Sequence, residues 1–253
     1  LKRAQQAMKQ IRKGVATTVL RSWNLRKLEF QLCLTDDIVA TPPFGFCDVL
    51  INPANEAMVG TKLPYFPMPV EPPRELRNTR WCGMEAGSMM FYPMQVVDGR
   101  VHRMGGASLR EACDQLPECS PGIKCPTGEA VVTEATENLK IFFHHIVHAV
   151  PPMYTSPDWE RSLSRCWEAA LEKAWSCGRA PTVASPLLGA GARGAPVGEA
   201  AQVGARAIAT WAETAAEGTL CLAFCEEEVA AEAEVEVRRV LDLTSAEKMA
   251  VLT

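Results

Sequence analysis

The stretch PTVASPLLGAGARGAPVGEAAQVG, residues 181–204, indicates the fold class. Its first part, Pro181–Ser185, is short and apolar and predicts a buried strand. Its last part opens an Ala-rich segment, Val197–Glu217, that predicts a helix. The glycine-rich loop Pro186–Pro196 lies between them. A strand that leads through such a loop into a helix is typical of a parallel α/β sheet, whose ligands bind at the carboxyl edge of the strands.

The glycines of this loop point to an anion-binding site. Gly189, Gly191 and Gly194 let the backbone approach a ligand closely and direct N–H groups at it. The helix that follows would add its positive end, so a phosphate or diphosphate is the natural ligand. No Gly-Lys-Ser/Thr follows, and the spacing is not that of the dinucleotide fingerprint, which excludes both of those phosphate loops. A tight strand–helix turn without a ligand is the alternative.

Strands and helices alternate on both sides of this stretch. Strands are predicted at Leu28–Leu34, Cys47–Ile51, Glu129–Thr133, Ile141–Val150 and Thr219–Phe224. Helices are predicted at Leu1–Lys13, Gly106–Leu116, Ser156–Cys177 (capped by Ser156), Glu226–Leu241 and Ser245–Leu252. The alternation predicts an α/β fold with a mostly parallel sheet that helices cover on both faces.

The chain divides into two predicted parts. Residues 1–27 should form an N-terminal helix and a first strand, and residues 28–253 the main domain. An insertion at about 61–95 interrupts that domain. It is rich in proline, methionine and aromatic residues and has no clean period, so we expect an ordered cover near the site.

Composition limits the function classes. The net charge is -4 and the pI about 5.7, so duplex nucleic acid is not an expected partner. No apolar run approaches the roughly 20 residues of a membrane helix, so no membrane is expected either. The ten cysteines form no C-x-x-C pair and predict mostly free thiols in an intracellular protein. We expect a monomer. We expect a cytoplasmic or nuclear location. The chain begins with Leu, so an organelle stays open.

Polar residues follow two of the predicted strands. Asn52 and Asn55 come directly after Cys47–Ile51 and offer donors and acceptors suited to sugar hydroxyls. An Asx turn that starts a helix is the alternative. Asp37, after Leu28–Leu34, could accept from an exocyclic amine or belong to a surface turn.

Histidines are grouped in the predicted strand Ile141–Val150. His144 and His148 would share one face of that strand and His145 the other, so the three should not converge on a metal. We therefore predict no metal site and no cofactor. His102 lies four residues after Asp98 on the same predicted helical face, and we expect a structural role for it.

In its order of motifs the chain resembles the macrodomain family, and within it the MacroD-type branch that includes plant and algal members. The matching blocks are Asp37-Ile38, Asp48–Glu56, Val97–Gly106, Cys125–Ala130, His148 with Val150-Pro151-Pro152, and Gly191–Pro196. The resemblance covers about Leu28 to Leu241 without the insertion. It implies a three-layer α/β/α fold with a central mixed, mostly parallel sheet, and ADP-ribose as the ligand.

The resemblance also implies roles for single residues. Asp98 and Asn55 would be catalytic, with Asp98 activating or orienting a water and Asn55 contacting the distal ribose. Asp37 would accept from the adenine amine. The implied ligand contacts are Asp37, Ile38, Asn52, Asn55, Gly105, Gly189, Ala190, Gly191, Ala192, Arg193, Gly194 and Phe224, of which Gly191–Gly194 would wrap the diphosphate and Phe224 would lie against adenine.

Two departures from the family pattern bear on activity. Members usually join the equivalents of Asn55 and Asp98 through a short run of glycines, whereas 42 residues intervene here. Arg193 replaces an aromatic residue of the diphosphate loop. It could pair with an extra phosphate or face solvent.

The resemblance predicts a metal-independent hydrolase that cleaves a bond at the distal ribose. O-acetyl-ADP-ribose, in a deacetylase reaction, and mono-ADP-ribosylated protein esters are the expected substrates. One alternative is a phosphatase or cyclic phosphodiesterase that acts on ADP-ribose with a terminal ribose phosphate. Another is a non-catalytic reader of ADP-ribosylated proteins. The same scaffold hosts all three.

Overall fold

The structure is a computed structural model and describes residues 17–60, 96–214 and 217–251. The predicted helix Leu1–Lys13 and the predicted insertion at 61–95 lie outside the described residues.

The described residues form one seven-stranded sheet in the order β1-β2-β7-β6-β3-β5-β4. The strands are β1 (Thr18–Leu25), β2 (Leu28–Leu34), β3 (Val49–Pro53), β4 (Ala130–Glu134), β5 (His145–Ala149), β6 (Thr182–Ser185) and β7 (Gly218–Phe224). Strands β2, β7, β6, β3 and β5 run parallel. The edge strands β1 and β4 are antiparallel to their neighbours. The first strand predicted before residue 28 is therefore an edge strand of the same sheet.

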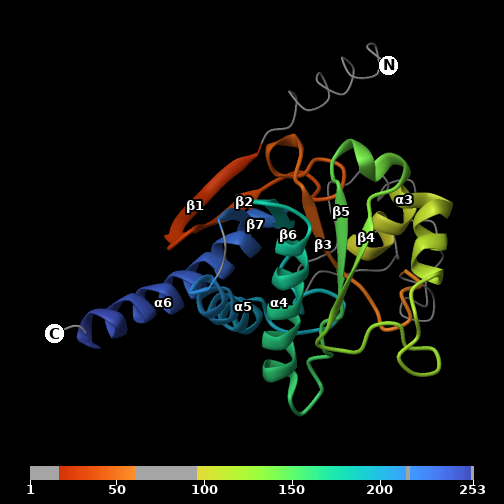
Figure 1. Cartoon of the computed structure of the whole chain (residues 1–253). Coiled ribbons are helices and arrows are strands. Elements are labelled where there is room, and N and C mark those ends of the chain that lie inside the picture. The colour runs from red at the N-terminus through yellow and green to blue at the C-terminus, as the bar shows by residue number, and fades with distance from the viewer. Residues whose placement is uncertain (1–16, 61–95, 215–216, 252–253) are drawn as a thin grey trace.

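Helices cover both faces of the sheet (Figure 1). They are α3 (Val97–Asp114), α4 (Trp159–Ser176), α5 (Val197–Ala212) and α6 (Glu227–Val251), with short 3-10 turns at Pro43–Gly45 (η1) and Glu137–Ile141 (η3). Neighbouring strand residues pack on opposite layers: Ile51 contacts the core shared with α4, α5 and α6, and Leu50 the core shared with α3. The predicted three-layer α/β/α fold with a mixed, mostly parallel sheet is confirmed.

Several predicted helix boundaries were wrong. Helix α3 (Val97–Asp114) is kinked at Gly106, where φ is 58° and ψ is -151°, so the helix predicted from Gly106 corresponds to its second part, and the part before the kink was not predicted. Val97 and Val101 before the kink and Leu109 after it are all buried. Helix α4 begins after Asp158 instead of being capped by Ser156. The two predicted C-terminal helices form a single helix, α6.

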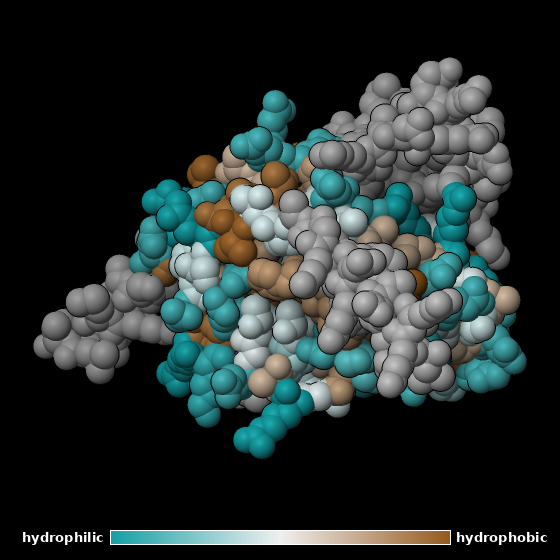
Figure 2. All heavy atoms as spheres, turned by 90° about the horizontal axis from the view of Figure 1, so that it is seen from above, coloured by the Kyte–Doolittle hydropathy of each residue, from teal (hydrophilic) through white to brown (hydrophobic). Residues whose placement is uncertain are grey.

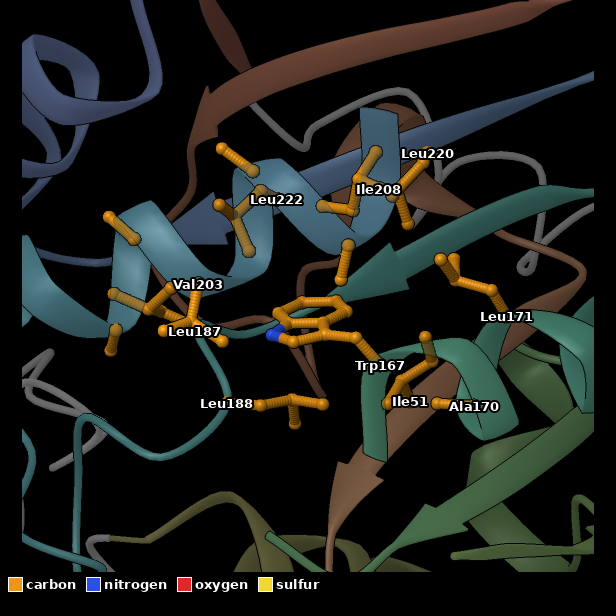
Figure 3. Packing of buried hydrophobic residues seen from close by; sticks show 14 of the residues in the cluster. Ile51, Trp167, Ala170, Leu171, Leu187, Leu188, Val203, Ile208, Leu220 and Leu222 are labelled. Atoms are coloured by element: carbon orange, nitrogen blue, oxygen red, sulfur yellow. The ribbon is translucent and has the colours of Figure 1, made fainter. Parts of the chain in front are cut away.

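Trp167 of α4 anchors the core between α4, α5 and the sheet. Its side chain is fully buried. Figure 3 shows the indole extending from α4 toward α5, with Leu187, Leu188 and Val203 around it. A Cβ at position 204 would lie 3.0 Å from the indole Nε1, so Gly204 of α5 gives the ring its space. This contact fixes α5, and with it the end of the glycine-rich loop, against α4.

The face seen from above is mostly polar, with a smaller hydrophobic area (Figure 2). In the described part of the chain, the exposed large hydrophobic residues are Val19, Phe44, Met153 and Val235. They lie on different elements and define no single surface. No helix among the described residues has the length and apolar character needed to cross a membrane.

Candidate functional site

A pocket opens at the carboxyl ends of β3 and β6, where the sequence predicted a site. Its empty space is about 420 Å³ with the open mouth included. The residues that line it come from the end of β3, the start of α3 and the glycine-rich loop, and include Pro53, Val97, Asp98, Gly189, Gly191 and Arg193. The fold therefore brings Asp98 and the loop together, although 90 residues separate Asp98 from Gly189.

The glycine-rich loop presents a row of backbone N–H groups. Two N–H groups are used inside the loop, because Gly194 donates to the Gly191 carbonyl at 2.9 Å and Ala195 to the Gly189 carbonyl at 3.1 Å. In the described part of the chain, the four N–H groups of Ala190–Arg193 donate to no protein acceptor. Gly189 and Gly194 have φ of 88° and 84°, values that favour glycine. Consecutive free N–H groups of this kind suit an anion.

The start of helix α5 offers an anionic ligand fewer free N–H groups than the sequence suggested. The Gly198 N–H donates to Glu232 Oε1 of α6 at 3.1 Å. A protein carboxylate thus already uses part of the positive helix end that the sequence analysis assigned to the ligand.

Asp98 lies in the first turn of α3 and is 4% exposed. Its Oδ1 accepts a hydrogen bond from Asn52 Nδ2 at 2.9 Å. His102, one turn further along α3, places Nε2 at 3.5 Å from the same oxygen. The sequence analysis expected a structural role for His102 and did not predict this contact, although the i,i+4 spacing from Asp98 was the signal.

A buried hydrogen-bond chain continues behind Asn52. Asn52 Nδ2 also lies 3.3 Å from His148 Nδ1, and His148 Nε2 lies 2.9 Å from Thr133 Oγ1. Because the Asn52 amine is a donor, Nδ1 of His148 accepts, and Nε2 carries the proton and donates to Thr133. Burial, with a smaller contribution from His102, lowers the pKa of His148 to about 3. His148 is therefore neutral at physiological pH.

The histidines group differently from the prediction. Strand β5 begins at His145, so His144 precedes the strand, and its Nδ1 lies 3.3 Å from Asp48 Oδ1. His148 instead lies near His102 and Cys113, whose potential ligand atoms are all within 4.8 Å of one another. Both nitrogens of His148 already have protein partners, and burial raises the pKa of Cys113 to about 11. Metal binding there would require breaking one of these hydrogen bonds.

Asn55 lies in the turn after β3, and no helix begins between it and Gly60, so the alternative of an Asx turn that starts a helix is not confirmed. Its Nδ2 lies 3.3 Å from the Gly60 carbonyl, and its Oδ1 accepts from the Val59 N–H at 3.4 Å. Both contacts are long and can yield to a ligand. The predicted contact of Asn55 with the distal ribose stays a prediction.

The sequence left two positions open for Arg193, pairing with an extra phosphate or facing solvent, and the structure matches neither in full. Its side chain is 14% exposed, so it does not face solvent. Nη2 donates to the Ala54 carbonyl at 3.0 Å and lies 3.7 Å from Glu56 Oε2. Because Arg193 also lines the pocket, it links the glycine-rich loop to the turn after β3.

Asp37 follows β2 at the same edge of the sheet, and both of its carboxylate oxygens are engaged. Oδ1 accepts from the N–H groups of Val39 and Ala40 at 2.9 and 3.2 Å. Oδ2 forms an ion pair with Arg100 of α3. Ile38 is buried beside it. The turn after β2 is buried at Asp37, Ile38 and Val39 and is no surface turn, and Arg100 joins it to the helix that carries Asp98.

Two predicted ligand contacts lie in the core. Gly105 is buried seven residues along α3 from Asp98, about 10 Å along the helix axis. A Cβ on Gly105 would lie 2.6 Å from Leu109 Cδ2, so helix packing requires this glycine. Phe224 is 2% exposed and belongs to the core with α4, α5 and α6. Its contact with adenine stays a prediction.

The expected free cysteines are found with one exception. Eight of the cysteines in the described ranges are free, among them Cys33, Cys113 and Cys166. Cys225, directly after β7, is disulfide-bonded. The expectation of free thiols therefore fails at this position.

Comparisons with known proteins agree with the fold. The profile described as Macro domain matches residues 86–204. A macro domain-containing protein of Vibrio parahaemolyticus is 36% identical over 132 residues, which cover 52% of this chain and 74% of that protein. A macro domain-containing protein of Xanthomonas campestris is 34% identical over 117 residues, 46% of this chain. The chain matches 63% of the length of the Xanthomonas protein.

Solved structures are similar in fold at low identity. The Oceanobacillus iheyensis macrodomain with ADP has a TM-score of 0.64 at 19% identity, covering 90% of this chain and 98% of that chain. The Trypanosoma brucei macrodomain in complex with ADP has a TM-score of 0.56 at 20% identity, covering 81% and 68%. The chain therefore belongs to the macrodomain family.

Proposed function

We propose that this chain binds ADP-ribose in the pocket between β3 and β6 and hydrolyses an ester bond at the distal ribose. One observation carries the proposal: the free N–H groups of Ala190–Arg193 and the buried carboxylate of Asp98 belong to the same pocket. A row of N–H groups suits a diphosphate, and a buried carboxylate beyond it suits proton transfer at the sugar. Structures of the Oceanobacillus and Trypanosoma macrodomains with ADP or ADP-ribose support this ligand.

The surroundings of Asp98 fit a general base or a residue that orients water. Asn52 donates to Oδ1 of Asp98, and the neutral His148 accepts a second hydrogen bond from the same Asn52 amine. Asp98 would take a proton from a water that attacks the acyl carbon. The bond from that carbon to the ribose oxygen then breaks, and the proton passes to the departing oxygen. The products are a carboxylic acid and ADP-ribose, and the substrates are O-acetyl-ADP-ribose or mono-ADP-ribosylated protein carboxylates.

Binding and turnover can be measured separately. Calorimetry should give micromolar binding of ADP-ribose and weaker binding of AMP. Chromatography should show conversion of O-acetyl-ADP-ribose to ADP-ribose. Asp98→Asn should lower turnover by about 10²–10⁴ and leave ADP-ribose affinity within a few-fold. Asp114→Asn, on an exposed turn at the end of the same helix, is the matched control and should behave as wild type.

A second candidate is a phosphatase acting on ADP-ribose with a terminal ribose phosphate. Arg193 supports it, because a mostly buried guanidinium lines the pocket and only Nη2 has a hydrogen bond within the described residues. Release of phosphate from that substrate, with no cleavage of the acetyl ester, would favour this candidate. Tight binding without turnover of either substrate would instead indicate a reader. Absence of ADP-ribose binding at millimolar concentration would contradict the proposal as a whole.

A further inference from the structure

The pocket has two chemically different sides. One is the glycine-rich loop, whose N–H groups at Ala190–Arg193 suit a diphosphate. The other side is apolar and adjoins Asp98. Its residues come from the ends of the neighbouring parallel strands β5, β3 and β6 and from the start of α3, and they are Pro151, Pro53, Leu187, Val96 and Val97. We call these residues the apolar wall.

The side chains of the apolar wall offer a ligand no hydrogen bond. Two of them are proline rings, which also remove the backbone N–H at their positions. The other three are hydrocarbon side chains that are 6% exposed or less. Among the described residues that line the pocket, only Asp98 and Arg193 have polar side chains. A ligand group that lies against this wall is therefore bound by burial of carbon, and a hydroxyl there would lose its hydrogen bonds to water.

The proposed reaction places the acyl group of the ester on this side of the pocket. Asp98 would act on the water that attacks the acyl carbon, so this carbon lies within reach of the carboxylate through one water. The N–H groups of Ala190–Arg193 would hold the diphosphate, and with it the ribose, on the side of the loop. The acyl chain leaves the same carbon in another direction. It therefore extends along the wall, to which Val96 and Val97, directly before Asp98, belong.

We infer that the apolar wall is an acyl-binding subsite, which makes propionyl and butyryl esters of ADP-ribose better substrates than the acetyl ester. This inference rests on the proposed function. Burial of each added CH₂ in the transition state should raise kcat/KM about fourfold. A phosphate ester gains nothing from such a wall, so the subsite also favours the esterase over the phosphatase.

Val96 is the wall residue best suited to a change of size. It directly precedes the first turn of α3, and no side-chain hydrogen bond caps the helix there. Val96→Leu adds a carbon to the wall and should shorten the acyl chain that fits. Val96→Ala removes carbon from the wall and should favour longer chains. A purely structural role of Val96 would not move the preferred chain length in opposite directions.

The test is the kcat/KM of the purified chain for the acetyl, propionyl, butyryl and hexanoyl esters of ADP-ribose. Each value is divided by the rate at which hydroxide hydrolyses the same ester, which removes differences in intrinsic reactivity. Wild type should favour butyryl over acetyl about 15-fold, the effect of two CH₂ groups. Val96→Leu should bring this ratio close to one, and Val96→Ala should raise the ratio of hexanoyl to butyryl. Val132→Ala, at a partly buried valine of β4 outside the pocket, is the matched control and should keep the wild-type ratios.

The wild-type series needs no variant, so a variant that fails to fold still leaves a decisive result. A butyryl to acetyl ratio near one in wild type would overturn the inference while the proposed function stands. Ratios that Val96→Leu and Val96→Ala both leave unchanged would also overturn it, because the acyl chain would then lie elsewhere. Hydrolysis of none of the esters would contradict the proposed function and this inference together.

Discussion

The buried His148 should make the stability of this protein depend on pH between about 5 and 6.5. Burial lowers the pKa of His148 from 6.5 to about 3 in the folded state. An unfolded histidine titrates near 6.5, so in this interval the unfolded chain binds more protons. The free energy of unfolding therefore rises with pH. The contribution of His148 is complete above pH 6.5 and is lost as the pH falls toward 3.

The size of the effect follows from the shift. The slope approaches about 1.4 kcal/mol per pH unit below pH 6, and at pH 5 the loss relative to pH 7.5 is about 2 kcal/mol. The pKa of Glu56 is lowered from 4.5, despite the opposing effect of burial, by hydrogen bonds that include one from Thr127. Glu56 also lowers the free energy of unfolding as the pH falls, but at lower pH than His148. Measurements above pH 5 separate the two groups.

The assay is urea unfolding followed by tryptophan fluorescence at several pH values from 5 to 7.5. His148→Gln should flatten the slope in this interval. At pH 7.5 it should cost about 1–3 kcal/mol through the contacts with Asn52 and Thr133. His145→Gln, at the partly exposed start of the same strand, is the control and should keep the wild-type slope. An unchanged slope in His148→Gln would refute the inference that His148 is buried in its neutral form.

Three further predictions concern stability and binding. Thr133→Val should cost about 1–3 kcal/mol, since the His148 N–H loses its acceptor; urea unfolding at pH 7.5 measures this, and a cost below about 0.5 kcal/mol would contradict it. Gly189→Ala should destabilise the fold by about 1–2 kcal/mol and weaken ADP-ribose binding, because φ is 88° and the new Cβ would lie 3.2 Å from Leu163. A melting temperature and an affinity equal to those of wild type would contradict this prediction. Trp167→Ala should cost about 3–5 kcal/mol, visible as a lower urea midpoint, whereas a loss under 1 kcal/mol would mean that the core repacks around the site.

Local patterns determined the sheet and the loop. Alternation predicted β2, and short apolar runs predicted β3, β6 and β7, all within a few residues. The loop was predictable because glycines between a strand and a helix are a local signal. The pocket lies at the predicted edge of the sheet because parallel strands all end at the same edge.

Contacts between distant segments were decided by the tertiary structure. Asp98 and Asn52 are 46 residues apart and meet only because α3 packs against β3. The Asp37–Arg100 ion pair, which changes the character of the expected adenine acceptor, joins the turn after β2 to α3. No local signal records such pairs, since each residue alone fits an ordinary surface turn or helix face.

The sequence by itself therefore determined the class of fold and the place of the glycine-rich loop, because these depend on hydrophobic period and on glycine within short windows. Tertiary structure decided which polar groups remain free for a ligand. Glu232 accepts a hydrogen bond from an N–H group of α5, Arg193 donates to the Ala54 carbonyl, and Arg100 forms an ion pair with Asp37. A hydrogen-bonding group is available only when no neighbour satisfies it, and the folded chain alone determines its neighbours.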